Sequence, residues 1–553
     1  MTRIPRLIAF VSTITLLLVT AASGGRGPGL FPGDPFPPSL SVAIIHGQGQ
    51  ADLSKPLTLA ACLREALARN LDLSVDAVTP ALDDAAVTET REKFLPQFDM
   101  AYRRNDTTSL GSWGLQGTNY QSKNDYLSAG LTQKIITGAD LSLSFSNQMS
   151  DTAQAYTVIN PFYYSLLQFE LKQPLLKGFG PKINRIETTR AENTRDAGLA
   201  QLKAAVLQTV YDVEEAYWNL LYAQENLKVQ EASLAQSRET LKRSNEAARI
   251  GSKSAIEVLS AETEVTRWED GAISARLQVE RLEEQLRRLM NSGTAAGEPG
   301  ETRADAAGSR LLLADRPSAE KRAIGLDEAL RTALAERPEI LSAEKDLETS
   351  GNDVGYYRNQ LLPQLDLDFS IWNPGQSGVK FLYLDDNPLT QIVIGKIVGS
   401  RKDSLKDVFR KYYRNWSLNL NLSLPLANIF SRASLTKANL ANQQSLLRLE
   451  RQKKTIASEV SAAVLDLRNT ERKIKSSADY RAMVEKRLAA EQQRYDLGLV
   501  GSEWLFSYQR DLAQARTDEV RAQVDYKIAL AKLDKVMGTT LKTKGLTFRN
   551  FAF

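Results

Sequence analysis

The stretch LREALA at residues 63–68 recurs as LRTALA at residues 330–335, and the tripeptide LPQ at residues 95–97 recurs at residues 362–364. Both pairs are displaced by 267 positions. A displacement this large exceeds the unit of a solenoid, which has about 20–50 residues. The pattern therefore indicates two copies of one half-structure within a single chain.

The two copies set the expected domain organisation. We expect a first repeat over residues 57–291 and a second over residues 324–538, joined by a linker at residues 292–323. Residues 24–56 are rich in proline and glycine and are expected to form an extended leader, and residues 539–553 a C-terminal tail.

Residues 1–23 have the pattern of a secretory signal peptide. Arg3 and Arg6 precede an apolar run at residues 7–19, and Ala21-Ala22-Ser23 supplies the small residues of a cleavage site. A membrane anchor is the alternative, but it needs about 20 apolar residues. The chain has one cysteine and a net charge of +4 with 25% charged residues, which predicts neither a disulfide framework nor nucleic-acid binding.

The clearest local signal is a heptad spacing of apolar residues in long segments without proline. A helix from about Asn184 to Ala248 would be nearly 100 Å long. The first seam comprises Leu199, Val206, Val213, Leu220, Leu227, Leu234 and Leu241. The second copy repeats it at Leu446, Val460, Leu467, Ile474 and Leu488, with Lys453 and Arg481 as two exceptions. Such seams predict coiled-coil packing, and a tethering coiled coil is one alternative that they leave open.

Short segments in which apolar and polar residues alternate lie between the helical regions. They are centred on Phe98–Tyr102, Leu141–Phe145, Phe169–Leu171, Leu365–Ile371 and Trp416–Leu424. No segment after the signal is apolar enough for a transmembrane helix, whereas this alternation is typical of strands with an apolar outer face and a polar inner face in a membrane barrel.

The number of strands predicts an oligomer. Each chain has too few strands to close a pore, and lipid does not tolerate open sheet edges. Three copies would supply about 12 strands, or about 18 if an added hairpin near Leu131 and Leu141 joins the barrel. The segments at residues 103–124 and 374–413 are expected to connect strands on the cell exterior.

The order of motifs, repeated twice, resembles the TolC-type outer-membrane efflux channels over residues 57–538. The motifs are LPQ before each first strand, QPLL at residues 173–176, LPL at residues 424–426, RIG at residues 249–251 and YDLG at residues 495–498. The resemblance implies a mainly α fold with membrane β: a homotrimeric outer-membrane β-barrel continued by a long periplasmic α-helical (coiled-coil) barrel. It further implies the exit duct of a tripartite efflux or type I secretion system, in contact with outer-membrane lipid, a periplasmic adaptor and an inner-membrane pump.

The resemblance also implies roles for residues at the two helical turns. Gly251 and Gly498, which differ by 247 positions, follow long helices and are suited to end them in a left-handed conformation. With Ile250 and Leu497 they would form the periplasmic tip on which the adaptor docks.

Four residues near the turns are candidates for a gate. Glu257 and Tyr495 match positions that tie the two helical pairs in the closed channel, and a phenol and a carboxylate can form a charge-assisted hydrogen bond. Trp504 and Ser507 stand where some relatives carry a ring of aspartates, so an acidic constriction is not expected here. Trp504 could instead form an apolar constriction, or be a packed residue at the start of a helix.

Two other classes of protein fit less well. An enzyme lacks support because His46, in the leader, is the only histidine, so no catalytic base, metal site or cofactor site is expected. A periplasmic adaptor shares helical hairpins, but it would not carry two copies with outward-facing apolar strands. The sequence thus favours a channel and no enzymatic activity.

Overall fold

The computed structural model describes residues 56–110, 119–152, 157–291, 310–317, 322, 324–390, 392–410, 413–497 and 499–546. All of them belong to one compact unit, Gly47–Phe553. The expected signal peptide, nearly all of the leader, most of the linker, the end of the tail and Gly498 lie outside the described residues.

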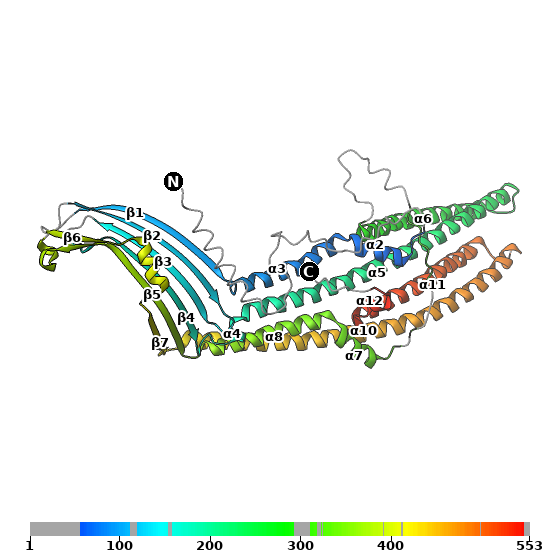
Figure 1. Cartoon of the computed structure of the whole chain (residues 1–553). Coiled ribbons are helices and arrows are strands. Elements are labelled where there is room, and N and C mark those ends of the chain that lie inside the picture. Colours follow the sequence, from blue (N-terminus) through cyan, green and yellow to red (C-terminus); the bar gives the residue numbers. More distant parts are fainter. Residues whose placement is uncertain are drawn as a thin grey trace. The chain divides into compact units, whose positions relative to one another are not determined.

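Both copies contain the same order of elements: two helices, antiparallel strands and a long helical hairpin (Figure 1). The first copy comprises α2 (Leu59–Arg69), α3 (Leu71–Glu92), β1 (Gln97–Leu110), β2 (Asn119–Lys134), β3 (Asp140–Thr152), β4 (Ile159–Pro174), α4 (Pro181–Asn184), α5 (Ile186–Arg249) and α6 (Ala255–Met290). The second comprises α7 (Leu326–Glu336), α8 (Pro338–Asn359), β5 (Gln364–Tyr383), two short 3₁₀ turns η1 (Leu384–Asp386) and η2 (Pro388–Thr390), β6 (Val393–Val398), α9 (Arg401–Arg410), β7 (Asn415–Ser423), α10 (Ile429–Asp496), α11 (Ser502–Met537) and α12 (Thr540–Thr543). The two internal repeats predicted from the sequence are present.

Each copy begins with a helix that is interrupted after three turns. Asn70 ends α2 by donating its backbone N–H to Ala66 O (2.8 Å), and its side chain caps α3 by accepting from Leu73 N (2.9 Å). In the second copy Pro338 starts α8, a position where its missing N–H is not needed. Asn70 Nδ2 also donates to Leu289 O (3.0 Å), so the break holds the end of α6 in place.

The described strands form one antiparallel sheet in the order β1-β2-β3-β4-β5, with β6 and β7 on the other side of β5. β7 pairs with the half of β5 nearest the helices, from Gln364 to Trp372, and β6 pairs with its far end, from Val379 to Tyr383. The added hairpin, β2 and β3, lies between β1 and β4 with continuous register. It therefore belongs to the sheet and is not a separate rim above it.

The segments expected to connect strands are largely regular structure instead, so that part of the prediction is wrong. Residues 103–110 and 119–124 continue β1 and β2, and residues 374–383 continue β5. In residues 103–110 and 119–124 polar residues occupy both faces, so the period of two that marks a strand in the sequence is lost. In β5, Pro374, Gly375 and Gly378 interrupt the alternation instead.

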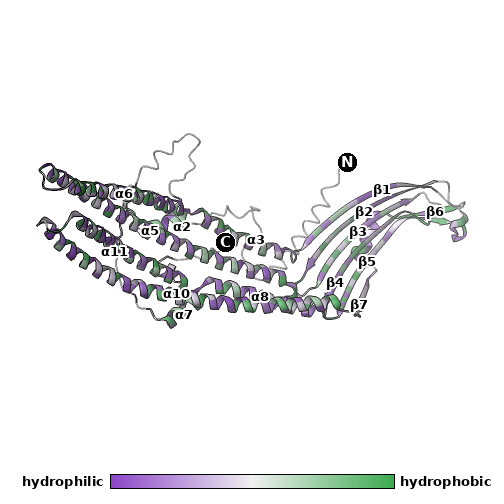
Figure 2. Cartoon of the chain, turned by 180° about the vertical axis from the view of Figure 1, so that it is seen from behind, coloured by the Kyte–Doolittle hydropathy of each residue, from purple (hydrophilic) through white to green (hydrophobic). Residues whose placement is uncertain are grey.

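The register gives the sheet two chemically different faces, and Figure 2 shows hydrophobic and hydrophilic residues alternating along the strands. One face carries a continuous apolar row across six strands: Phe98, Leu131, Leu143, Phe169, Ile371 and Trp416. The opposite face carries a polar row: Gln97, Thr132, Ser142, Glu170, Ser370 and Ser417. We call these the apolar face and the polar face. They agree with the predicted pattern of barrel strands.

The long helices pack along most of the predicted heptads: in the second copy Val460 and Leu467 are buried, whereas Leu446 is 44% exposed. The expected helix from Asn184 to Ala248 is α5, and its seam is buried at Val206, Val213, Leu220 and Leu227. Near the sheet, α3, α5, α8 and α10 are neighbours in that order; near the turns, the order is α6, α5, α11 and α10. None of the described helices has an apolar stretch long enough to cross a membrane.

Parts of the expected linker and tail belong to the core of the first copy. Leu311 is fully buried there, and Leu57 N donates to Leu312 O (2.7 Å). Lys544 Nζ, just after α12, lies 2.6 Å from Glu214 Oε1 on α5. The described portions of both segments therefore pack against the first copy and stabilise it.

Candidate functional site

The turn between α5 and α6 is closed by a glycine in a left-handed conformation. Gly251 has a φ of +79°, and its N–H donates to Ala248 O (3.0 Å). Ser252 N donates to Ala247 O (2.9 Å), and these two bonds together form a Schellman motif. Ser254 then caps α6 by accepting from Glu257 N (3.4 Å). The turn is therefore short and fixed by backbone hydrogen bonds.

The turn between α10 and α11 follows the same plan. Leu499 N donates to Arg494 O (2.9 Å), the bond that corresponds to the one made by Ser252. Gly498, the expected helix-ending glycine, lies outside the described residues. Gly501 precedes α11 with a φ of −78°, so its conformation is open to any residue.

Apolar side chains gather on the surface of both turns. The most exposed are Ile250, Ile256, Leu259, Leu497 and Leu499, with exposed fractions from 62% to 79%. Single exposed apolar residues are ordinary, but a cluster of them marks a surface that contacts another molecule. Ile250 and Leu497, expected at the tip from the sequence, belong to this cluster.

Lys253 ties the two turns together. Its ammonium donates a hydrogen bond to Tyr495 Oη and lies 4.5 Å from the centre of the Tyr495 ring. The same ammonium lies 3.8 Å from Glu257 Oε2. Among the described residues, Tyr495 and Glu257 thus meet through Lys253, and the direct hydrogen bond expected between them is not formed.

A second tie lies further along the same helices. Arg510 of α11 donates to Glu264 of α6 at 2.8 Å, and the Glu264 side chain is only 5% exposed. Arg267 approaches the same carboxylate at 3.5 Å. Two more polar contacts follow from α11 to α5: Thr517 to Asn226 (3.4 Å) and Arg521 to Asn219 (3.2 Å). Polar contacts thus connect the first helical pair, α5 and α6, with the second, α10 and α11, at several levels.

Trp504 and Ser507 lie on the first turns of α11. The Trp504 ring stacks on Tyr508 with centroids 6.4 Å apart, and Arg487 of α10 donates to Tyr508 Oη (2.9 Å). Trp504 remains 60% exposed, and Ser507 is half-buried.

Sequence reasoning missed Lys253, Glu264 and Arg510. Lys253 stands four residues before Glu257, a spacing that brings side chains together on a helix, but it precedes the cap of α6. Glu264 and Arg510 are 246 positions apart and carry no local signal. Only the packing of α6 against α11 brings them together.

A family model described as outer membrane efflux protein matches residues 139–292 and 329–539, more than half of the chain. No curated protein sequence matches the chain.

Solved structures resemble the chain over most of its length. The outer membrane channel CmeC of Campylobacter jejuni is 16% identical, with a TM-score of 0.61 over 89% of this chain and 90% of that chain. The open state of the outer membrane channel MtrE of Neisseria gonorrhoeae is 19% identical, with a TM-score of 0.57 over 87% and 89%. The outer-membrane channel OprN is 17% identical, with a TM-score of 0.60 over 87% and 90%. At these identities the likeness concerns the fold.

Proposed function

We propose that this chain, which belongs to the outer membrane efflux protein family, closes its barrel as a homotrimer and serves as the exit duct of a tripartite efflux or secretion machine. Its family is one of outer-membrane efflux channels, not of adaptors or tethers, and we propose that it has no enzymatic activity.

The observation that carries the trimer is the pair of open sheet edges. Within the described residues, β1 forms one edge of the sheet, and β7 together with the shorter β6 forms the other. β1 runs away from the helices and β7 runs towards them, so β1 of one copy can pair antiparallel with β7 of the next. Both edges carry apolar residues that lipid would cover, and closure removes the unpaired backbone groups. Three copies then give about 18 long strands, a number at which porins enclose an aqueous channel.

The helical turns are the proposed docking surface for the periplasmic adaptor, which in turn would connect to the inner-membrane pump. The exposed cluster around Ile250 and Leu497 provides apolar area, and the backbone hydrogen bonds at Gly251 fix its shape. A rigid apolar surface lowers the entropy that docking must overcome.

The contacts between the helical pairs are the proposed gate. Lys253, Tyr495 and Glu257 are partly exposed, so each of their contacts contributes about 1 kcal/mol or less. Glu264 is buried, and loss of one partner from a buried ion pair costs about 3–5 kcal/mol. The outer contact is therefore weak enough for a docking partner to break, while the inner contact sets the larger barrier to separation of the pairs. Trp504 and Ser507 are further candidates for the narrowest part of the tip.

Planar-bilayer recording from the purified protein, combined with its mass in detergent, tests the proposal. We expect a trimer that conducts at low level when closed. A monomer that retains its sheet in detergent would contradict the trimer, and a trimer without conductance in wild-type and gate variants alike would contradict the duct.

A further inference from the structure

The helix α9, seen as the short yellow helix beside the strands in Figure 1, lies across the sheet. Ser404 Oγ is 3.0 Å from Ser165 Oγ of β4, and both Ser404 and Val408 are fully buried. A Cβ on Gly375 of β5 would lie 2.0 Å from Ser404 O, so only glycine lets the helix approach this closely. α9 is thus seated on the strands and does not project from them.

The register shows which face α9 covers. Ser165 is four residues from Phe169 on β4, so both side chains point to the apolar face. The ring of Phe409 stacks near Phe145 with centroids 6.4 Å apart, and Arg401 lies 3.6 Å from Asp125. Phe145 and Asp125 belong to the same face by the pairing of β2 with β3. The helix therefore lies on the apolar face, opposite the polar face that would line the lumen.

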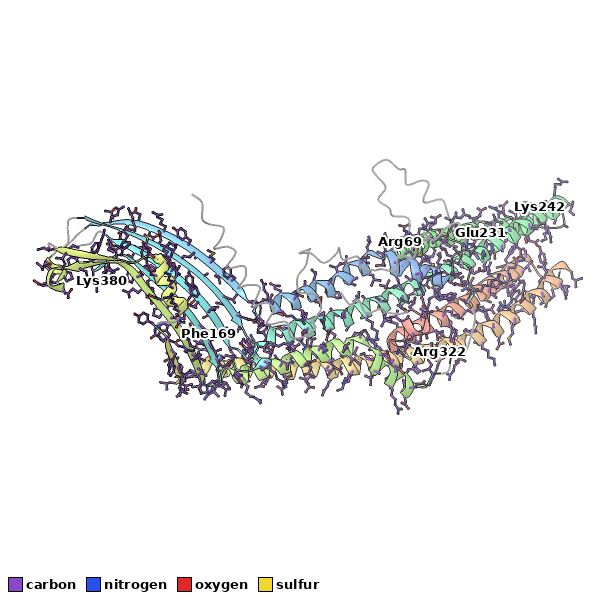
Figure 3. All side chains as sticks on the ribbon, viewed as in Figure 1. Arg69, Phe169, Glu231, Lys242, Arg322 and Lys380 are labelled. Carbon is purple, nitrogen blue, oxygen red and sulfur yellow. The ribbon has the colours of Figure 1, made fainter. Side chains whose placement is uncertain are left out.

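α9 also lies at the height where polar residues begin to enter the apolar face. Above the apolar row through Phe169, the next row is Met100, Ala129, Phe145, Leu167 and Asn373. The row after that is Tyr102, Leu127, Asn147, Ser165 and Gly375, and α9 covers its last three members. The row beyond it adds the polar residues Arg104, Asp125 and Ser377 to Met149 and Tyr163. This level is at the end of the strands away from the helices, and Figure 3 shows Phe169 nearer the helices and Lys380 at the far end.

The outward side of α9 is basic. Lys402, Lys406 and Arg410 are exposed and, with Phe409, repeat at the spacing of one helical face. Asp403 accepts from Ser400 N (2.9 Å) and lies 3.4 Å from Lys406, so it neutralises part of this charge. No carboxylate within the described part of the chain forms an ion pair with Lys402 or Arg410. A basic face with one aromatic residue at the end of an apolar surface is typical of helices that lie in a membrane interface.

We propose that α9 binds phosphate-bearing lipid headgroups of the outer leaflet through Lys402, Lys406 and Arg410, with Phe409 reaching the acyl region. This inference rests on the proposed barrel, which puts the apolar face towards lipid. Basic residues near a membrane surface attract anionic headgroups, and the guanidinium of Arg410 can contact a phosphate through two N–H groups.

The test measures binding of fluorescent bisphosphorylated lipid A to the purified trimer in neutral detergent. The variant carries Lys402→Gln, Lys406→Gln and Arg410→Gln. The matched control carries Lys228→Gln, Lys242→Gln and Arg243→Gln on α5, where Lys242 lies near the helical turns (Figure 3). We expect the α9 variant to bind at least about tenfold more weakly and the control to bind as the wild type does. Phe409→Ser, which keeps the charges, should weaken binding less than the triple variant.

Equal affinity of the α9 variant and the wild type would overturn the inference. Competition by millimolar inorganic phosphate as effective as competition by unlabelled lipid would also overturn it, since the site would then recognise a soluble anion. A change of cation-to-anion selectivity in the triple variant would place α9 in the lumen and refute the lipid contact. Conductance of the same trimers separates the two proposals, because a conducting trimer with unaltered lipid binding contradicts only the role of α9.

Discussion

The ammonium of Lys253 in the first helical turn is shared between the hydroxyl and the ring of Tyr495, the penultimate residue of α10. One side chain thereby joins two hairpins that are 242 positions apart in the sequence. A contact of this kind holds the turns together only while the two helical pairs lie side by side.

Lys253→Met should open the channel. It removes the hydrogen bond, the ring contact and the partner of Glu257, so a loss of about 1 kcal/mol would shift the ratio of open to closed channels about fivefold. Tyr495→Phe keeps the ring contact and Glu257→Ala keeps the tyrosine contact, so both should have smaller effects. Single-channel recording gives the order, with Lys242→Met on the exposed side of α5 as control. Wild-type conductance of Lys253→Met would remove this contact from the gate.

Arg510→Met should destabilise the helical pairs more than any change at Lys253. It leaves the buried Glu264 carboxylate with Arg267 alone, and the cost should lie near the lower end of about 3–5 kcal/mol. Thermal unfolding followed by circular dichroism should show a lower Tm, which the double variant Glu264→Leu with Arg510→Met largely restores. Arg276→Met, which breaks an exposed pair with Glu231, serves as control and should change stability by less than about 1 kcal/mol. If Arg510→Met lowered the stability no more than Arg276→Met does, the assignment of Glu264 as the stronger contact would be contradicted.

Cysteines on the two sheet edges should crosslink neighbouring subunits. Met100 of β1 and Leu420 of β7 are exposed members of the apolar face and stand near the middle of the apolar part of each strand. In a closed barrel the apolar parts of all strands lie at one level in the membrane, which places residues 100 and 420 of neighbouring subunits side by side. The double variant Met100→Cys with Leu420→Cys should therefore yield covalent trimers on oxidation. Cys62 is buried and contributes little background. Ala101→Cys with Leu420→Cys points to opposite faces and should crosslink poorly; comparable yields would show that the predicted pairing is incorrect.

Gly251→Val should impair the first turn. A β-branched residue at a φ of +79° is strained by about 1–2 kcal/mol, although no neighbouring atom would collide with its Cβ. Adaptor binding to the purified trimer should weaken, while the trimer itself persists. Gly501→Ser is the matched control, because its φ of −78° suits serine and serine is a preferred cap. Unchanged adaptor binding by Gly251→Val would show that docking does not require the shape of this turn.

Glu214→Gln should stabilise the protein at pH 8. Burial raises the pKa of Glu214 above its usual 4.5, although the positive charge of Lys544, whose ammonium lies 2.6 Å from the carboxylate, opposes this. Because the folded pKa exceeds the unfolded one, the ionised carboxylate costs stability as pH rises through the folded value, and the cost vanishes below pH 4.5. Unfolding curves at pH 8 and pH 4 should therefore differ between variant and wild type only at pH 8. A lower Tm of the variant at pH 8 would mean that the contact with Lys544 outweighs burial.

Periodic features of the sequence predicted most of the fold. The heptads gave the long helices because buried residues such as Val213 and Leu220 recur along one stripe of α5. The LPQ repeats mark strand starts, since β1 begins at Gln97 and β5 at Gln364. Alternation also separated the two faces of the sheet.

Features that do not recur at a fixed spacing along the sequence were not predicted. α9 was expected to be part of a loop because its helical pattern has only two fully buried positions, Ser404 and Val408, among charged residues. The contact of Lys253 with Tyr495 depends on how two hairpins pack, which no local spacing encodes. The turn residues Gly251, Ile250 and Leu497 were found because helix ends have their own sequence signals.

Because β2 and β3 are inserted between β1 and β4, the circumference of the proposed β-barrel comes close to the circumference of the helical tube. About 18 strands, spaced 4.8 Å apart and tilted by about 40°, would enclose a barrel roughly 110 Å around. With four helices per chain at each level, a trimer has about 12 helices, and at 8–10 Å between axes they form a tube about 100–120 Å around. A barrel without the hairpin would be about one third narrower. In the proposed trimer, the extra strands would let the duct leave the periplasm and cross the membrane at nearly constant bore.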